Sequence, residues 1–150
     1  MKWIIDIHSK KPYPSDALSN CAPHSFTLDG VPIASMEGFL QALKEPDPQQ
    51  QREICLLSGP DAKKRGGELD WKQKGLLYWQ GTVVDRFSPA YGALLTRAYD
   101  QLGQVPAFRE ALRATGRAIL LHSIGRVLRK DTCLTRREFL RQLYRLRKTL

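Results

Sequence analysis

Residues 18–44 read LSNCAPHSFTLDGVPIASMEGFLQALK and decide the fold. Asp29-Gly30 is a turn dipeptide between two short apolar runs, so residues 26–33 are expected to form a β-hairpin. Ser35 is a preferred N-cap residue, and residues 36–44 follow it as a helix. The sequence therefore predicts a turn, a hairpin and a helix in close succession.

The predicted helix has one apolar face and an acid in its first turn. Four apolar side chains at helical spacing should face the core: Met36, Phe39, Leu40 and Leu43. Glu37 sits where free backbone N–H groups and the helix dipole favour an ionised carboxylate. The sequence thus predicts an ionised Glu37 at the start of this helix.

This stretch resembles the NADAR family, the YbiA-like N-glycosidases associated with NAD and ADP-ribose. That family carries F-S-N-F, a short hairpin, and then T-S-E-H-x-x-Q-A-x-K. The matching positions are Ser19, Asn20, Glu37, Gln41, Ala42 and Lys44. The chain departs from the pattern at Cys21, which replaces a Phe, and at Gly38, which replaces the family's His.

The resemblance implies roles for these side chains. Cleavage of an N-glycosidic bond passes through a cationic, oxocarbenium-like sugar, which a carboxylate beside the anomeric carbon stabilises. Glu37 would take that role or activate water, and Ser19 and Asn20 would bond the ribose hydroxyls. Gln41 and Lys44 would contact the ligand further along the helix. The alternative for Glu37 is an ordinary first-turn helix acid.

A second similarity to the family lies in residues 59–67, GPDAKKRGG. Pro60 favours a helix start and Gly66-Gly67 favours its end. Lys63 and Lys64 match a family pattern, Ala-Lys-Lys-x-Gly-Arg, and consecutive cations on a short helix are suited to a phosphate. A solvated face is the alternative interpretation of these lysines.

Residues 69–87 are rich in aromatic and apolar side chains, and we predict a helix there, kinked near Gly75 or Gly81. Trp79 is a candidate to stack on a base or a flavin-like ring. Packing in the core is the alternative for so large a side chain.

The largest departure from the family follows residue 121. The family continues with Glu, Asp and Trp-Gly, whereas this chain has His122, no acid in the next eight positions and no Trp-Gly. His122 is a candidate for the missing role, as an acid, a base or a hydrogen-bond donor. A core histidine with satisfied hydrogen bonds is the alternative.

The length and composition of the chain limit its number of domains, its metal chemistry and its localisation. One hundred and fifty residues suit one domain with one core. The three cysteines and three histidines lack metal-ligand spacing, so we expect no metal, no cofactor and reduced thiols. Because there is no membrane-length apolar run and no secretory leader pattern, we expect a cytoplasmic protein without a membrane partner.

The net charge of +9 is concentrated near the end of the chain. Residues 117–150 hold ten lysines and arginines against Asp131 and Glu138, a net charge of +8. Such a basic region on a balanced body indicates an anionic partner, and a nucleic acid is one candidate.

The expected fold is mainly α: one YbiA-like helical domain over residues 1–150. About six helices should pack around residues 35–44 and 90–102, and the capping box Thr135-x-x-Glu138 should open the last helix. A small sheet should combine residues 3–7, the 26–33 hairpin and residues 118–124.

Three functional hypotheses follow. The first is an N-glycosidase acting on an ADP-ribosyl or phosphoribosyl N-glycoside. Some members of the resembled family remove ADP-ribose from a nucleobase, so a modified nucleobase is one possible substrate. The second is a module that binds ADP-ribose or a nucleotide without turnover. The third is a basic nucleic-acid-binding protein. The oligomeric state does not follow from the sequence.

Overall fold

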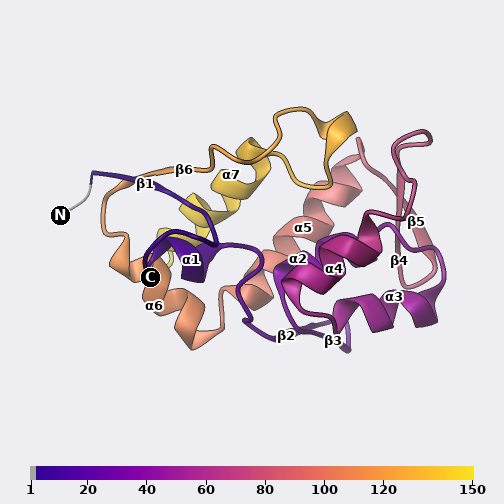
Figure 1. The fold of residues 1–150 in the computed structure, drawn as a ribbon, viewed down its shortest axis with the longest axis horizontal. Coiled ribbons are helices and arrows are strands. Elements are labelled where there is room, and N and C mark those ends of the chain that lie inside the picture. Colours follow the sequence, from indigo (N-terminus) through magenta and orange to yellow (C-terminus); the bar gives the residue numbers. More distant parts are fainter. Residues whose placement is uncertain (1–2) are drawn as a thin grey trace.

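The computed structural model describes residues 3–150 and is dominated by helices (Figure 1). The helices are α1 (Ser15–Leu18), α2 (Met36–Ala42), α3 (Pro48–Cys55), α4 (Gly59–Gly66), α5 (Pro89–Leu102), α6 (Pro106–Ala114) and α7 (Arg136–Arg147), with one 3₁₀ turn, η1 (Arg129–Asp131). The strands are β1 (Ile4–Asp6), β2 (Phe26–Leu28), β3 (Val31–Ile33), β4 (Leu76–Trp79), β5 (Thr82–Asp85) and β6 (Ile119–Leu121). The expectation of a mainly helical fold is confirmed.

Figure 1 shows α2, α3 and α4 gathered at one end of the molecule with the hairpins β2–β3 and β4–β5. The other end holds β1, β6, α1 and α6. Helix α5 lies between the two ends, and the segment between β6 and α7 runs across the top toward β5 before it turns back. Within residues 3–150, no helix is long and apolar enough to cross a membrane.

The helix starts predicted from capping residues are confirmed. The Ser35 hydroxyl accepts a hydrogen bond from Gly38 N–H at 3.1 Å, and Asp47 accepts one from Gln49 N–H at 3.2 Å. Thr135 and Glu138 form the expected capping box at the start of α7. These bonds satisfy N–H groups that have no partner inside a helix, so local sequence is sufficient to place the helix starts.

The sheet prediction was confirmed for residues 3–7 and 118–124, which pair, and was wrong for the 26–33 hairpin, which does not join them. The hairpin β2–β3 forms as expected, with Phe26 opposite Ile33, but it is a sheet of its own. Strand β1 pairs only with β6, in parallel, with Ile5 opposite Leu120. This pairing joins strands more than one hundred residues apart and is decided by tertiary packing, because a parallel pair needs a long crossover connection.

The helix predicted over residues 69–87 was also wrong, because residues 76–85 form the hairpin β4–β5. Gln80 and Gly81 both have positive φ, 50° and 84°, as the primed two-residue hairpin turns require. Leu77 and Trp79 alternate into the core at the spacing of a strand. The apolar residues of this segment also occur at helical spacing, so their pattern alone fits both a helix and a hairpin. The turn residues Gln80 and Gly81 decide in favour of the hairpin.

Helix α2 is packed closely between α3 and α4 because glycines stand at its contacts. A Cβ built on Gly38 would lie 3.2 Å from the Cys55 carbonyl oxygen of α3. A Cβ on Gly66 of α4 would lie 1.8 Å from Gln41 Oε1. The apolar face of α2 is buried in the core as predicted. The His that the resembled family carries at position 38 has no room in this chain.

Candidate functional site

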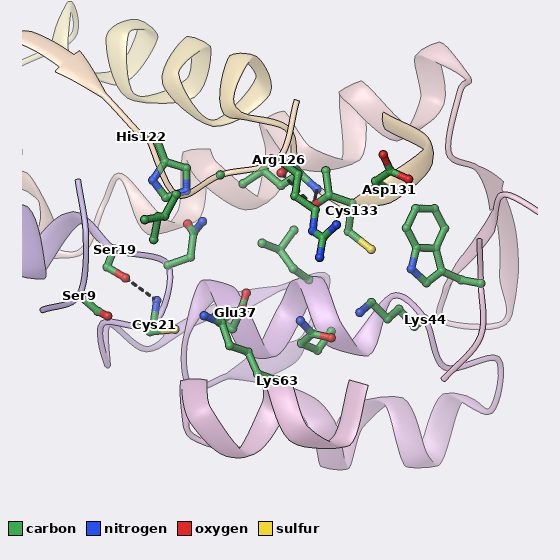
Figure 2. A pocket seen from close by; sticks show the side chains of 18 of the residues that line it. Ser9, Ser19, Cys21, Glu37, Lys44, Lys63, His122, Arg126, Asp131 and Cys133 are labelled. Carbon is green, nitrogen blue, oxygen red and sulfur yellow. Dashed lines mark hydrogen bonds and ion pairs between the residues drawn. The ribbon is translucent and has the colours of Figure 1, made fainter. Parts of the chain in front are cut away.

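A cavity of about 360 Å³ lies between two walls of different construction. The first wall, which we call the floor, is formed by α2, α4 and the 19–21 turn. The second, which we call the far wall, is formed by residues 122–134 (Figure 2). Its volume falls within the range of ligand pockets in proteins.

Seven of the nine side chains selected from the sequence line this cavity: Ser19, Asn20, Glu37, Gln41, Lys44, Lys63 and His122. Two do not. Lys64 is exposed on α4 outside the cavity lining. Trp79 is buried in the core, where its ring meets Phe39 edge-on at 5.2 Å and its Nε1–H donates to Asp29 at 2.8 Å. These two side chains therefore lie outside the cavity.

Glu37 is buried, with 8% of its surface exposed, and its backbone N–H donates to the Asn20 carbonyl oxygen at 2.8 Å. Lys63 Nζ lies 3.8 Å from Glu37 Oε1. Burial raises the pKa of the Glu37 carboxyl, and the nearby Lys63 and Lys44 only partly oppose that rise. Burial therefore acts against the charged form that the helix start was expected to favour.

The Asn20 side chain is held in place by a hydrogen bond from α5. The hydroxyl of the buried Tyr99 on α5 donates to Asn20 Oδ1 at 2.7 Å. The Asn20 amide oxygen is thereby engaged, which leaves its NH₂ group as the donor available to a ligand. Tyr99 was not selected from the sequence, since the apolar face of a helix gives no sign of such a contact.

Gln41 stands on α2 one turn beyond Glu37. Within residues 3–150 its buried Oε1 atom has no hydrogen-bond partner. A buried acceptor without a donor is costly, and such atoms often mark ligand sites. The absent Cβ of Gly66 leaves the space that this side chain occupies.

His122 lies on the far wall with its ring orientation fixed. Its Nδ1 bonds the Ile7 carbonyl oxygen at 3.0 Å, so Nδ1 carries the hydrogen in the neutral ring. Burial lowers the pKa of the imidazole. A neutral ring with Nδ1 protonated presents Nε2 as an acceptor, which favours the base among the predicted roles and disfavours the acid and the hydrogen-bond donor.

The turn after His122 is anchored at the carboxyl ends of the parallel strands β1 and β6. The Asp6 carboxylate accepts hydrogen bonds from the N–H and hydroxyl of Ser123 and pairs with Lys11 at 3.1 Å. These contacts lower the pKa of Asp6 to about 2. Arg136, at the start of α7, donates to the carbonyl oxygens of Ser123 and Gly125.

The far wall continues through residues 131–134, which a buried arginine holds in place. Arg86 is 1% exposed, donates to the Thr132 carbonyl oxygen at 2.9 Å and pairs with Glu138 through two bonds of 2.6 and 3.0 Å. The Tyr91 hydroxyl donates to the Cys133 carbonyl oxygen at 2.6 Å. Arg86 and Tyr91 thus fix the backbone of this part of the wall.

Asp131, nine positions after His122, places a carboxylate on the far wall, where the chain lacks the acids that the resembled family carries after residue 121. Sequence reasoning missed it together with Trp71, Lys72 and Arg126, which also line the cavity. Lys72 lies in the segment wrongly taken as a helix. Arg126 lies within the basic region, and its positive charge was the available signal.

The charge of the cavity is predominantly positive. Four cations line it, Lys44, Lys63, Lys72 and Arg126, against the acids Glu37 and Asp131. Among residues 3–150, only Lys63 of these cations has an ion-pair partner. A cavity with this balance attracts an anionic ligand such as a phosphate.

Part of the basic region has structural rather than binding roles. Arg145 pairs with Asp100 at 2.6 Å, and Arg147 donates to the Ala118 carbonyl oxygen at 2.9 Å. Within the basic region, the exposed Arg126 lines the cavity, and the exposed Arg129 and Lys130 immediately precede Asp131, which also lines it.

The fold resembles that of the E. coli protein YbiA, a NADAR-family protein. Its NMR structure matches with a TM-score of 0.63 at 19% sequence identity, over 99% of this chain and 86% of that chain. At this identity the likeness concerns the fold, and the NADAR-like fold implied by the motifs is confirmed.

Sequence comparison assigns the chain to a phage family. The family model described as Bacteriophage protein GP30.3 matches residues 12–148, so the chain belongs to that family. A 17.1 kDa protein encoded in the Gp30-rIII intergenic region of Enterobacteria phage T4 is 42% identical over 149 residues, covering 97% of this chain and 98% of that protein.

Proposed function

We propose that the protein hydrolyses the N-glycosidic bond of a ribosyl substrate that carries phosphate, either ADP-ribosyl or phosphoribosyl. The observation that carries the proposal is a buried carboxylate, Glu37, inside a cavity whose other charged groups are mostly cations. This combination suits a sugar that becomes positive at one carbon while its phosphate remains negative.

Glu37 is suited to activate water. In the proposed step the C1′–N bond breaks, its electron pair leaves with the nitrogen, and water adds to C1′ while Glu37 accepts the water proton. That proton then passes to the leaving nitrogen of a neutral base, or to solvent where the nitrogen was cationic. A carboxyl whose pKa is raised by burial is a better proton acceptor near neutral pH than an exposed one. Before it takes the proton, the negative charge of the carboxylate stabilises the oxocarbenium-like sugar.

The other cavity side chains would bind and orient the substrate. The Asn20 amide NH₂ and Ser19 hydroxyl would bond the ribose hydroxyls, and His122 Nε2 would accept a hydrogen bond from the departing base. Lys44, Lys72 and Arg126 would hold the phosphate.

The test is hydrolysis by the purified protein and by Glu37→Gln. The panel contains NAD⁺, a DNA oligonucleotide with ADP-ribosylated guanine and a phosphoribosyl N-glycoside, with release of ADP-ribose or ribose 5-phosphate measured. We expect Glu37→Gln to lower kcat by about 10²–10⁴-fold, the usual contribution of a general base. The matched control Glu53→Gln changes an exposed acid outside the cavity and should retain activity. Full activity in a folded Glu37→Gln would contradict the mechanism.

Binding without turnover is the second candidate, and Gly38 favours it. The family's His at this position has no room against the α3 carbonyls, so any catalytic contribution from it is missing here. A thermal shift with ADP-ribose and no product from any substrate in the panel would support this candidate.

A nucleic-acid-borne substrate is favoured by the exposed Arg126, Arg129 and Lys130 beside the cavity. Binding of a modified oligonucleotide should then weaken as salt rises, and replacing these cations should reduce the salt dependence. A nucleic-acid-binding protein without the glycosidase function would bind the unmodified oligonucleotide equally well and ignore competition by ADP-ribose.

A further inference from the structure

A second cavity lies apart from the candidate site, at the end of the molecule that holds β1, β6, α1 and α6 (Figure 1). Its volume is about 600 Å³, and it shares no lining residue with the cavity that contains Glu37. Apart from Thr115 and Arg117, its lining side chains are apolar. The Thr115 hydroxyl donates to the Leu112 carbonyl oxygen at 2.6 Å and is thereby satisfied. A lining of this kind suits an apolar group rather than a phosphate.

A tryptophan stands exposed at the rim of this second cavity. Trp3 lines the cavity and is 74% exposed, whereas the other two tryptophans, Trp71 and Trp79, are buried. A cavity of about 150 Å³ admits a benzene ring, so the second cavity has room for an indole. One surface thus carries a projecting aromatic side chain and, beside it, an apolar cavity that can receive one.

The apolar surface continues over the sheet beside the cavity. Ile4 and Ile119 are opposite one another in the parallel pair β1–β6, and they are 56% and 55% exposed. The next pair, Ile5 and Leu120, is buried on the other face of the sheet. Parallel sheets occur almost only with both faces covered, so the outer face of β1–β6 lacks the cover that such sheets usually have.

The exposed apolar area at this end matches that of a protein interface. Four exposed apolar side chains line the cavity or adjoin a lining residue in the chain: Trp3, Ile4, Tyr13 and Ile119. Together they expose on the order of 500 Å², taking about 200 Å² for a fully exposed large apolar side chain. A standard interface takes about 800 Å² from each partner, of which roughly 60% is apolar, or about 500 Å². A partner surface of standard size would therefore cover this area.

The charges at this end are self-complementary. Arg117 lines the cavity, and the exposed Asp16 lies on α1, which packs against α6. Among residues 3–150, neither side chain has an ion-pair partner. Identical surfaces meet in a two-fold dimer, so a contact between Arg117 of one chain and Asp16 of the other is made twice. Such charge pairs fix the orientation of an interface even where they add little affinity.

We propose that this end of the molecule forms a two-fold symmetric homodimer, in which Trp3 of each chain enters the apolar cavity of the other. A projecting side chain and a receiving cavity on the same surface are what such a contact requires, because each chain then supplies both parts. None of the residues that line the cavity with Glu37 lines this one. The dimer therefore does not depend on the proposed hydrolysis.

Sedimentation equilibrium of the whole chain over micromolar concentrations tests the dimer, with tryptophan fluorescence measured on the same samples. The wild-type chain should form dimers, and its emission should move to shorter wavelength as they form, because Trp3 is the exposed tryptophan that becomes buried. Truncation of a tryptophan hot spot costs a factor of about 30, and the two-fold axis imposes that loss twice. Trp3→Ala should therefore raise the dimer dissociation constant about 10³-fold.

Two further variants test the cavity and the charges. Ala114→Phe keeps Trp3 but fills the cavity, since Ala114 is exposed on the last turn of α6 and lines it, so it should also abolish the dimer. Arg117→Glu should weaken association, and Arg117→Glu/Asp16→Lys should restore it. The matched control Leu56→Ala removes an exposed leucine just after α3, at the opposite end of the molecule, and should leave association unchanged.

Each contrary result would overturn the proposal. A wild-type chain that stays monomeric would exclude the dimer, and short-wavelength emission from that monomer would show Trp3 buried in its own cavity. A dimer that persists in both Trp3→Ala and Ala114→Phe, each folded by circular dichroism, would place the interface elsewhere. Failure of the charge exchange to restore association would contradict the two-fold arrangement.

Discussion

The two walls of the cavity are built in different ways. The floor consists of the capped helices α2 and α4, which pack against each other through glycine contacts. The far wall is mostly irregular chain over residues 122–134, held by side chains from β1, α5, α7 and the end of β5. The floor depends on close backbone packing, whereas the far wall depends on a few buried polar contacts.

This difference has a consequence for function. The floor supplies Glu37 and Gln41 from one helix, so their relative positions follow from helical geometry, and the glycine contact between α2 and α4 sets the position of Lys63. The far wall supplies His122 and Asp131 from loops, so their positions depend on contacts made far away in the sequence. Substitutions should therefore damage the two walls through different mechanisms.

The largest effect is expected from Arg86→Met, which removes the main anchor of the far wall. The change leaves Glu138 without its partner and the Thr132 carbonyl oxygen without its donor. Loss of one partner of a buried ion pair costs about 3–5 kcal/mol, and the 24% exposure of the Glu138 side chain places the expected loss near the lower figure. Urea unfolding measures it.

Arg113→Met is the control, because Arg113 pairs with Glu110 on the exposed surface of α6. It should change the free energy of unfolding by less than about 1 kcal/mol. If both variants were equally stable, Arg86 would not be an anchor of the wall. Hydrogen exchange at residues 132–134 should rise only in Arg86→Met.

Gly66→Ala tests the floor. The new Cβ would lie 1.8 Å from Gln41 Oε1 and 2.9 Å from Gln41 Cβ, so moving the end of that side chain is not sufficient to relieve the contact. We expect a destabilisation of about 1–3 kcal/mol, as for other overpacked sites, together with weaker ADP-ribose binding. Thermal unfolding and calorimetry measure the two effects.

Gly92→Ala is the matched control. Gly92 lies within α5 with no atom within 4 Å of a built Cβ, so this change should stabilise the helix by up to about 1 kcal/mol. Equal effects of the two substitutions would show that helix propensity rather than the α2–α4 contact decides the result.

Lys63→Met should shift the pH dependence of kcat/KM. Glu37 must be ionised to accept a proton, so activity falls as pH drops through its pKa, which burial raises above 4.5. Lys63 opposes that rise, and its removal should move the acid limb to higher pH. Lys64→Met, which changes the neighbouring lysine outside the cavity, should leave the limb in place. An acid limb that moved to lower pH in Lys63→Met would contradict the assignment to Glu37.

Asp6→Asn should have the smallest effect, a loss of stability that is present at neutral pH and disappears as the pH falls toward 2. The folded pKa of Asp6 is about 2, below its ordinary value of 3.8, so its carboxylate contributes stability that is present above 3.8 and lost as pH falls toward 2. The variant should therefore lose less stability than the wild type over that interval. Unfolding measured between pH 5 and pH 2 tests this, and parallel curves would contradict it.

The sequence was most informative where structure is local. Ser35 and Thr135 cap the helices that they were expected to cap. It was least informative in residues 69–87, where apolar spacing alone favoured a helix. The pair Gln80-Gly81 adopts the same positive φ values as Asp29-Gly30, so the second hairpin had a local signal of the same kind as the first.

By itself, the sequence determined the floor of the cavity: the turn at Ser19-Asn20, the hairpin after it, and the helices that carry Glu37 and Lys63. These follow from caps, turns and helical periodicity, which act over a few residues. Only the tertiary structure decided the far wall, where Asp6, Arg86 and Tyr91 hold segments distant in sequence. It also set the direction of the Glu37 pKa shift, because the burial that raises this pKa depends on the whole fold.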